Sequence, residues 1–151
     1  MKLFKSIIGD SAILLFLLGF AFSCSNKSTE SEEIHPLVGS WEISAMTTLN
    51  QGETETFNQS QLNEMGVIWK YIFSEDYSAE QITNISGSLL SMPGTWSASE
   101  TQLTLVLLGP TGSEGTLKYL YRIEDDILKL NWQLQDGPEY FAEFTKLNEE
   151  K

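Results

Sequence analysis

The chain has 151 residues, of which 41% are apolar and 20% charged, and its formal net charge is −12. This composition suits one globular domain with a single core. Such a negative field repels nucleic acid and anionic membrane surfaces, which argues against both as partners of the folded surface, and it indicates a cationic partner only weakly.

The first 23 residues have the features of an export signal. Lys2 and Lys5 give a positive start, and an apolar stretch follows over residues 13–22. This stretch is shorter than the ~20 residues that a permanent membrane-spanning helix needs. It runs into Cys24, the only cysteine of the chain, so an internal disulfide is excluded.

The segment Ala21-Phe22-Ser23-Cys24 resembles a bacterial lipoprotein signal, although Ala21 stands where leucine is commoner. That resemblance implies cleavage after residue 23 and acylation of Cys24 with palmitate-type chains. Several acyl chains hold a protein stably on a bilayer without crossing it. The alternative is a free or buried thiol, but the polar residues that follow Cys24 offer nothing to bury it.

Residues 24–36 are predicted to form a flexible acidic tether, because residues 25–33 contain no large apolar side chain. Ser25 directly after the cysteine resembles lipoproteins sent to the outer membrane. Glu30, Glu32 and Glu33 resemble the acidic export tags of surface lipoproteins in the Bacteroidetes. We therefore expect a lipid-anchored protein of the cell envelope at the outer membrane, with the periplasmic or surface leaflet left open.

Residues 37–148 are predicted to form the folded domain, because apolar residues there recur with a period of two, which indicates strands with one face inward. Short turn signals such as Asp125-Asp126 separate the strands and favour hairpins. The expected fold is an all-β, antiparallel, up-and-down barrel of eight strands, preferred over an open sandwich because closure removes both edges. The expected strands begin at Leu37 and continue over residues 67–73, 77–85, 95–98, 102–108, 116–124, 127–134 and 139–147.

One short helix is expected after the first strand. Asn58 suits an N-cap with Gln61 three residues on, and Gly66 suits a stop. A single turn is not stable alone. We expect it to dock as a lid over one mouth of the barrel through three apolar side chains, namely Phe57, Leu62 and Met65.

Three short motifs resemble the small lipocalin-like lipoproteins of the Bacteroidetes: Gly39-Ser40-Trp41, Gly94-Thr95-Trp96 and Phe144-Thr145-Lys146-Leu147. The resemblance spans residues 37–147. It implies that Gly39 and Trp41 form a plug at the closed end of the barrel, and that a basic side chain, Lys146 or Arg122, lies across the tryptophan. It also implies a binding protein.

No catalytic constellation is visible in the sequence. The single histidine, His35, falls in the tether, where we expect no rigid neighbour to position it. Gly-x-Ser-x-Gly, a phosphate-binding Gly-Lys-[Ser/Thr] and Cys/His clusters are absent. Adjacent acids such as Asp125-Asp126 fall on turns and stay solvated, which leaves a weak calcium contact as a minor alternative. We therefore predict no enzymatic activity, no cofactor and no metal site.

The predicted inward face is rich in aromatic residues, which can line an apolar pocket or fill it. The candidate ligand-lining residues are Trp69, Tyr71, Phe73, Tyr119, Tyr121 and Trp132. Two functions fit these features. The first is an anchored protein that binds a small hydrophobic molecule in the barrel. The second is an interaction or inhibitor module with a filled core, which contacts another envelope protein through loops such as residues 109–115.

Overall fold

Nine antiparallel strands and one short helix make up the part of the chain that the computed structural model describes, residues 34–85 and 87–148. The predicted signal segment, Cys24 and residues 25–33 of the tether lie outside these residues. The elements are β1 (Gly39–Asn50), β2 (Glu53–Asn58), α1 (Gln59–Glu64), β3 (Trp69–Phe73), β4 (Ser78–Ile85), β5 (Ser88–Ala98), β6 (Gln102–Leu108), β7 (Glu114–Glu124), β8 (Ile127–Gln133) and β9 (Glu139–Leu147).

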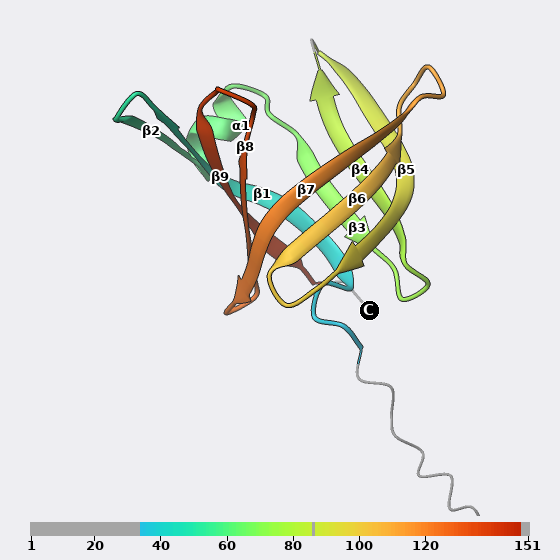
Figure 1. Ribbon diagram of the computed structural model, residues 1–151. Helices are drawn as coiled ribbons and strands as arrows, with labels where there is room; N and C mark the ends of the chain where they lie inside the picture. Colours follow the sequence, from blue (N-terminus) through green and yellow to red (C-terminus); the bar gives the residue numbers. More distant parts are fainter. Residues whose placement is uncertain (1–33, 86, 149–151) are drawn as a thin grey trace, which may run out of the picture. The chain divides into compact units, whose positions relative to one another are not determined.

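Eight of the strands close into the predicted barrel (Figure 1). The hydrogen-bonded order runs from β1 through β3 to β9, and β1 pairs again with β9, which completes the circle. Every pairing is antiparallel. Sequential neighbours therefore lie side by side, as short turns require.

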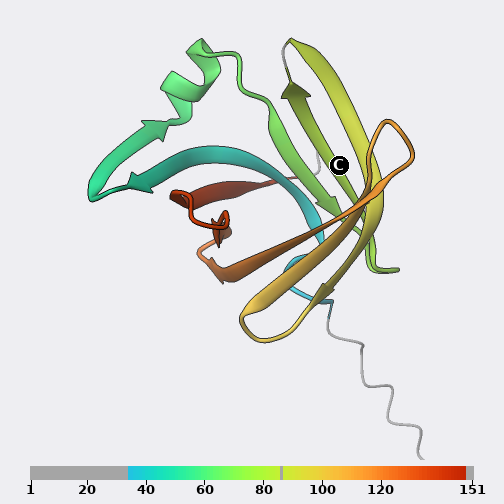
Figure 2. The same ribbon diagram turned by 45° about the horizontal axis from the view of Figure 1, so that its top comes forward.

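Strand β2 is an addition that the sequence pattern did not predict. It pairs with the second half of β1, from Ala45 to Asn50, whereas the first residues of β1, from Gly39 to Glu42, pair with β3. The register of β1 against β9 shifts between Ile43 and Ala45. This β-bulge bends β1 away from β3, because an extra residue increases the local twist. Figure 2 shows the long, curved path of β1 into the β1–β2 hairpin.

Strand ends gather at two ends of the barrel. The β3–β4, β5–β6 and β7–β8 turns and the start of β1 lie at the end that we call the base. The β1–β2 hairpin, α1 and the β6–β7 and β8–β9 loops lie at the opposite end, which we call the open end. The β7–β8 turn consists of Asp125 and Asp126, both with positive φ (51° and 59°). This conformation is typical of a two-residue hairpin turn, so the pair fulfils its predicted turn role.

Trp41 occupies the base. Its side chain is fully buried, and its indole Nε1 donates a hydrogen bond of 2.8 Å to the carbonyl oxygen of Leu37. The ammonium of Lys146 lies 5.2 Å from the centre of the indole ring, a cation–π distance. The other candidate, Arg122, instead forms an exposed ion pair with Glu124 at 3.5 Å. Lys146 is therefore the basic residue across the tryptophan.

Gly39 makes room for this contact. A Cβ at Gly39 would lie 2.8 Å from Cε of Lys146, and its φ of +130° is a conformation that side chains rarely adopt. Glycine can adopt this φ and leave room for the Lys146 side chain because it has no Cβ.

The second Gly-x-Trp motif also ends at the base. Trp96 donates from Nε1 to the carbonyl oxygen of Ser74 at 3.1 Å, and its ring packs 5.7 Å from that of Phe73. His35 packs against Trp96 at 5.2 Å, and its Nδ1 accepts a hydrogen bond from the backbone N–H of Leu37. The expectation that His35 has no rigid neighbour is therefore wrong, because the aromatic surface of Trp96 extends to it.

Helix α1 begins as predicted. The Asn58 side chain accepts from the backbone N–H of Gln61 at 3.1 Å, and the Gln61 side chain accepts from the backbone N–H of Asn58 at 3.0 Å. Leu62 is buried at 1% exposure and belongs to the core, and Phe57 is half-buried against it.

Met65 does not dock with these two residues, since it is 54% exposed. The helix ends at Glu64 and the chain turns through Gly66, which has a φ of +69°. The turn carries the Met65 side chain away from the barrel, so the predicted three-residue contact is reduced to Phe57 and Leu62.

The Trp41→Ala variant should lose about 3–5 kcal/mol of unfolding free energy, because the substitution removes a fully buried aromatic side chain and leaves a cavity in the core. Urea unfolding followed by circular dichroism measures the loss. Leu120→Ala is the control, since Leu120 is 58% exposed on the outer face and should change stability by less than about 0.5 kcal/mol. Equal stabilities for Trp41→Ala and the parent would contradict the plug assignment.

The Leu62→Ala variant should lose about 2–5 kcal/mol, as for other buried leucines. The Met65→Ala variant should change stability by no more than about 0.5 kcal/mol, because an exposed side chain leaves no cavity. The same urea titration compares the two, and a larger loss at Met65 than at Leu62 would refute this packing of α1.

Candidate functional site

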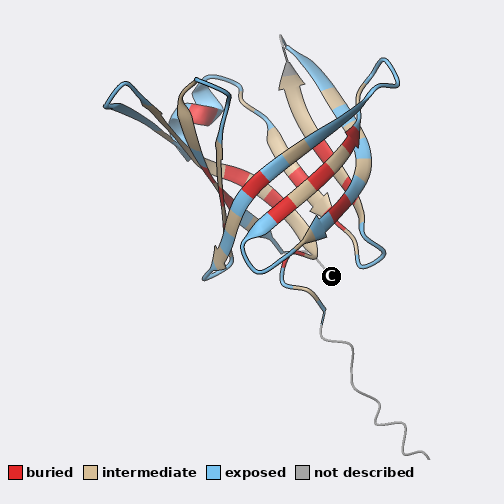
Figure 3. Cartoon of the chain, in the orientation of Figure 1, coloured by how far each residue is buried: buried red, intermediate tan, exposed pale blue. Residues whose placement is uncertain are grey.

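Burial of the inward-facing side chains changes along the barrel axis. The side chains of Leu37, Trp41, Phe73, Leu103 and Leu128 are at most 1% exposed. Toward the open end several inward-facing apolar residues are only partly buried, whereas Leu62 of α1 and Leu107 of β6 are buried there. Figure 3 shows the buried positions as a band across the middle of the strands, with intermediate and exposed positions at the upper strand ends. The partly buried set at the open end is Met46, Phe57, Trp69, Met92, Leu117 and Trp132.

Four of the six predicted ligand-lining residues form one aromatic cluster toward the open end. The ring of Trp69 lies 6.1 Å from Tyr71 and 5.8 Å from Trp132. Tyr119 lies 5.5 Å from Trp132 on the other side. Strands β3, β7 and β8 supply these rings, so residues far apart in the sequence meet inside the barrel. We call Trp69, Tyr71, Tyr119 and Trp132 the aromatic cluster.

The other two predicted lining residues lie nearer the base. Phe73 stacks on Tyr71 at 5.7 Å and contacts Trp96, within the packed core. The Tyr121 hydroxyl donates a hydrogen bond of 2.9 Å to the carbonyl oxygen of Ser99 in the β5–β6 turn. The alternation of apolar and polar residues in the sequence predicts that all six side chains face the interior. It does not give their positions along the barrel axis.

The hydroxyl groups of Tyr71 and Tyr119 lie 3.0 Å apart and form a buried hydrogen bond. Burial raises the pKa of Tyr71 well above its ordinary value, and the nearby Tyr119 raises it further. The Trp69 indole opposes this rise, although its N–H makes no hydrogen bond of normal geometry. Burial also raises the pKa of Tyr119. Both hydroxyls therefore stay neutral around pH 7, and each supplies the polar partner that the other needs.

Two further polar groups lie inside the barrel toward the open end. The Nε1 atom of Trp69 is buried and makes no hydrogen bond of full geometry among the described residues, but it lies close enough to the Tyr71 hydroxyl to oppose the rise in the pKa of Tyr71. Gln81 is 7% exposed and pairs with Tyr71 across β3 and β4, so its side chain shares the inward face. Its amide makes no hydrogen bond to another group in the described part of the chain.

Gln81 was not among the predicted lining residues, because apolar periodicity does not mark a polar side chain. A signal was available, since the β3–β4 turn at Glu75-Asp76 fixes the register of the hairpin and places Gln81 opposite Tyr71.

The wall of the barrel opens between β7 and β8 near the aromatic cluster. The last paired residues toward the open end are Leu120 and Asn131. Beyond them the two strands separate, and a hollow of about 640 Å³ forms between them. A second hollow of about 270 Å³ shares Tyr119 and Trp132 with it. The larger hollow is lined by Thr116, Leu117, Lys118, Tyr119, Trp132, Gln133 and Leu134.

This hollow is a suitable size for a small molecule, since ligand sites commonly have volumes of ~300–1,000 Å³. Leu117, Tyr119 and Trp132 belong to the inward face, whereas Lys118 and Gln133 belong to the outer face of the same strands. The hollow therefore connects the aromatic cluster with solvent through the side of the barrel. The sequence does not predict this opening, because apolar and polar residues continue to alternate along both β7 and β8 where the two strands separate.

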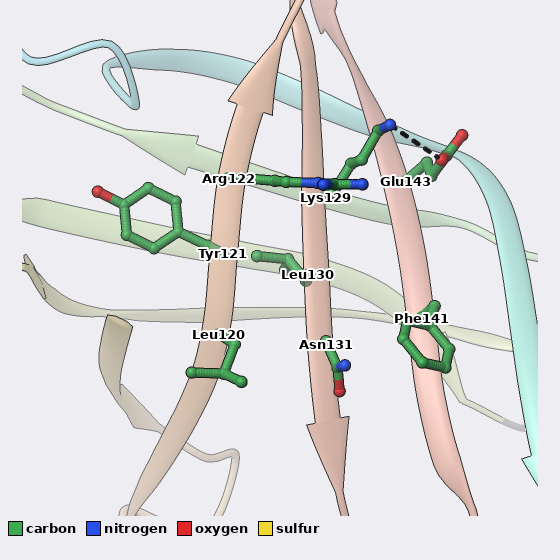
Figure 4. Close-up of a pocket in the computed structure, with 8 residues that line it drawn as sticks. All are labelled: Leu120, Tyr121, Arg122, Lys129, Leu130, Asn131, Phe141 and Glu143. Atoms are coloured by element: carbon green, nitrogen blue, oxygen red, sulfur yellow. Dashed lines mark ion pairs between the residues drawn. The ribbon is translucent and has the colours of Figure 1, made fainter. Parts of the chain in front are cut away.

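A third hollow, of about 290 Å³, lies on the outside of β7, β8 and β9 (Figure 4). Leu120 and Phe141 form its apolar part. The Lys129 ammonium there is held by Glu124 at 3.0 Å and by Glu143 at 3.9 Å. The Lys129 charge is therefore paired within the chain. The third hollow is separate from the aromatic cluster.

The described residues contain no group of three or more histidine, cysteine or acidic side chains that could hold a metal ion. No helix in the same ranges is long and apolar enough to cross a membrane.

Comparison with solved structures identifies similar folds. A lipocalin-like protein from Bacteroides uniformis is 18% identical with a TM-score of 0.51, and the match covers 75% of this chain and all of that one. An uncharacterised protein from Bacteroides eggerthii is 16% identical with a TM-score of 0.45, over 70% of this chain and 97% of the other. A redesigned β-barrel is 14% identical with a TM-score of 0.43, over 75% and 93%.

Sequence comparison gives the family. No curated protein matches this sequence. The family model of the lipocalin-like domain matches residues 37–130, which is more than half of the chain and includes both Gly-x-Trp motifs. The barrel, the buried Trp41 and the Lys146 contact agree with the resemblance inferred from those motifs. The chain therefore belongs to the lipocalin-like domain family.

Proposed function

We propose that the protein binds a small, mostly apolar molecule at the aromatic cluster and that acyl chains on Cys24 hold it on the outer membrane. The observation that supports binding is the juxtaposition of the aromatic cluster with the hollow between β7 and β8. Partly buried aromatic rings beside an opening offer apolar surface that a ligand can remove from water.

The interior is suited to a mostly apolar ligand because most of its side chains are apolar. Leu105 and Leu107 of β6 and Leu130 of β8 are buried in the same core as Tyr71 and Tyr119. The buried Tyr71–Tyr119 pair adds polarity without charge. Burial of apolar area gains roughly 25 cal/mol per Å², so a ligand that covers the exposed parts of Trp69, Trp132 and Leu117 gains affinity from contact area.

Membrane attachment is supported by the sequence pattern around Cys24 alone. Polar residues 25–33 would connect the acylated cysteine with the barrel, whose described contacts begin at His35. A ligand of limited solubility in water suits a protein held close to a bilayer. The residues from Ile34 onward form one compact unit with its own core. A soluble form of residues 25–151 therefore keeps every contact described above.

The Leu117→Trp variant should abolish binding of an apolar probe, because the larger side chain fills the hollow. N-phenyl-1-naphthylamine fluorescence should rise saturably with the soluble form and should not rise with this variant. Leu89→Trp is the control: Leu89 lies on β5, is 63% exposed and lines none of the three hollows, so this variant should bind the probe as the parent does. A parent protein that gives no saturable signal would favour the interaction module with a filled barrel.

The Cys24→Ser variant should appear in the soluble fraction of a Gram-negative host and should not incorporate an alkyne-bearing palmitate analogue. A single acyl chain binds membranes reversibly, whereas several give stable attachment, so loss of the acceptor cysteine should release the protein. The Ser25→Ala variant should remain labelled and in the membrane fraction. Equal labelling of Cys24→Ser and the parent would refute acylation at this residue.

A further inference from the structure

We infer that two copies of this chain form a dimer in which the first half of β7 in one copy pairs with the same segment of the other. The two strands run antiparallel, and Thr116 of one copy lies opposite Thr116 of the partner subunit. This inference goes beyond the proposed function, because it concerns an interaction surface and requires no ligand.

Strand β7 has a neighbour on only one side along its first half. It pairs with β6 from Glu114 to Leu120, but with β8 only from Leu120 to Glu124. Figure 1 shows the first half of β7 running away from β8. We call residues 114–119 the free edge of β7. An unpaired edge of this kind is a template on which a further strand can form hydrogen bonds.

Backbone hydrogen-bonding groups point away from β6 along the free edge. The backbone N–H of Tyr121 donates to the carbonyl oxygen of Thr101, which lies next to the start of β6. Successive residues of an antiparallel strand direct their N–H and C=O groups to opposite sides. Thr116 and Lys118 therefore direct theirs away from β6, and none of the described strands pairs with them on that side.

The charged side chains of the free edge complement a second copy of the same edge. Glu114, Thr116 and Lys118 are exposed and share the outward face of β7. Because Thr116 is midway between the other two, pairing centred on it sets Lys118 of each copy opposite Glu114 of the partner subunit. Opposite charges in directly opposed cross-strand positions stabilise a sheet. Within the described residues neither side chain takes part in an ion pair, so both are available.

The same interaction is unfavourable at the free edge of β2. This strand pairs only with β1, but it carries two acids, Glu53 and Glu55, and no base. A second copy of β2 would bring like charges together, which protects an edge from such pairing. The free edge of β7 carries one charge of each sign. Its self-complementary pattern gives an isologous contact, which closes after two copies.

The dimer also supplies a neighbour at the hollow between β7 and β8. Thr116, Leu117 and Lys118 of the free edge line this hollow. A strand paired with them lies across the side of the barrel where β8 has separated from β7. Ligand entry through this side therefore requires the two copies to separate.

A cysteine at the centre of the pairing tests the register. The soluble form of residues 25–151 contains no cysteine, since Cys24 is the only one in the chain. Hydrogen-bonded residues on opposite strands have Cα atoms about 5.5 Å apart, within the roughly 4.4–6.8 Å that a disulfide spans. The Thr116→Cys variant should therefore form a disulfide-linked dimer under mild oxidation, as measured by non-reducing electrophoresis. The control Thr54→Cys, at an exposed position of β2, should stay monomeric.

Sedimentation velocity measures the dimer without a crosslink. The soluble form is compared over about 10–1,000 µM, because small interfaces are commonly weak. At ~0.15 M salt, repulsion between the two acidic chains is largely screened beyond about 8 Å, whereas close cross-strand pairs persist. The weight-average sedimentation coefficient of the parent should rise with concentration toward the value of a dimer.

Charge exchange tests the cross-strand pairs. The Lys118→Glu variant should raise the dissociation constant at least about fivefold, because two opposite-charge pairs become like-charge pairs. Adding Glu114→Lys to this variant exchanges the two charges and should restore the dimer. The matched control is Arg122→Glu, which makes the same change of charge on the outward face where β7 is paired with β8. It should leave the dissociation constant unchanged.

The Thr116→Pro variant removes one of the backbone N–H groups at the free edge. Proline is tolerated at an edge position whose N–H faces solvent, so this variant should keep the circular dichroism spectrum of the parent and remain monomeric. A dimer that is unchanged by both Lys118→Glu and Thr116→Pro would overturn the assignment of the surface. Failure of the exchanged pair to restore the dimer would overturn the register.

A parent protein that stays monomeric at every concentration would overturn the inference and leave the free edge to a strand from a different protein. None of these measurements uses the fluorescent probe. The dimer can therefore fail while saturable probe binding, and with it the proposed function, stands.

Discussion

The closed end of the barrel depends on two tryptophans whose indole N–H groups bond to backbone carbonyl groups. Trp41 donates to Leu37 and lies under the Lys146 ammonium, and Trp96 donates to Ser74. Each bond satisfies the polar atom of a large buried ring, so the ring can fill the core without an unpaired donor. Because β1 passes from this end into the β1–β2 hairpin, the same contact also fixes where the first strand enters the barrel.

The other two tryptophans are placed differently. Trp69 and Trp132 are only partly buried, and the Nε1 atom of Trp69 makes no hydrogen bond of full geometry within the described residues. The barrel thus uses one residue type in two ways: Trp41 and Trp96 seal the base, whereas Trp132 lines the hollow between β7 and β8 and Trp69 packs against Trp132. This contrast is the physical basis for placing the binding site away from the Gly-x-Trp motifs that identify the family.

Much of the fold is predictable from the sequence, because alternating apolar residues define strands that are buried on one face. β6 and β9 have the predicted bounds, and the capping box of α1 forms as expected. β2 was missed because its residues are almost all exposed, so no alternation marks it. β5 begins earlier than predicted, at Ser88, because Pro93 and the glycine after it interrupt the pattern. The site was harder to predict: alternation gives the face of Gln81 and Tyr121 but neither their height in the barrel nor the separation of β7 from β8.

If the barrel is packed at the base and binds its ligand toward the open end, the four tryptophans report on both regions. The most direct measurement is a two-dimensional ¹H–¹⁵N NMR titration of the soluble form that follows the four indole N–H signals while N-phenyl-1-naphthylamine is added. The signals of Trp69 and Trp132 should shift saturably, and those of Trp41 and Trp96 should stay in place and exchange slowly with solvent. A shift confined to Trp41 or Trp96, or no shift at any of the four, would contradict this placement of the binding site.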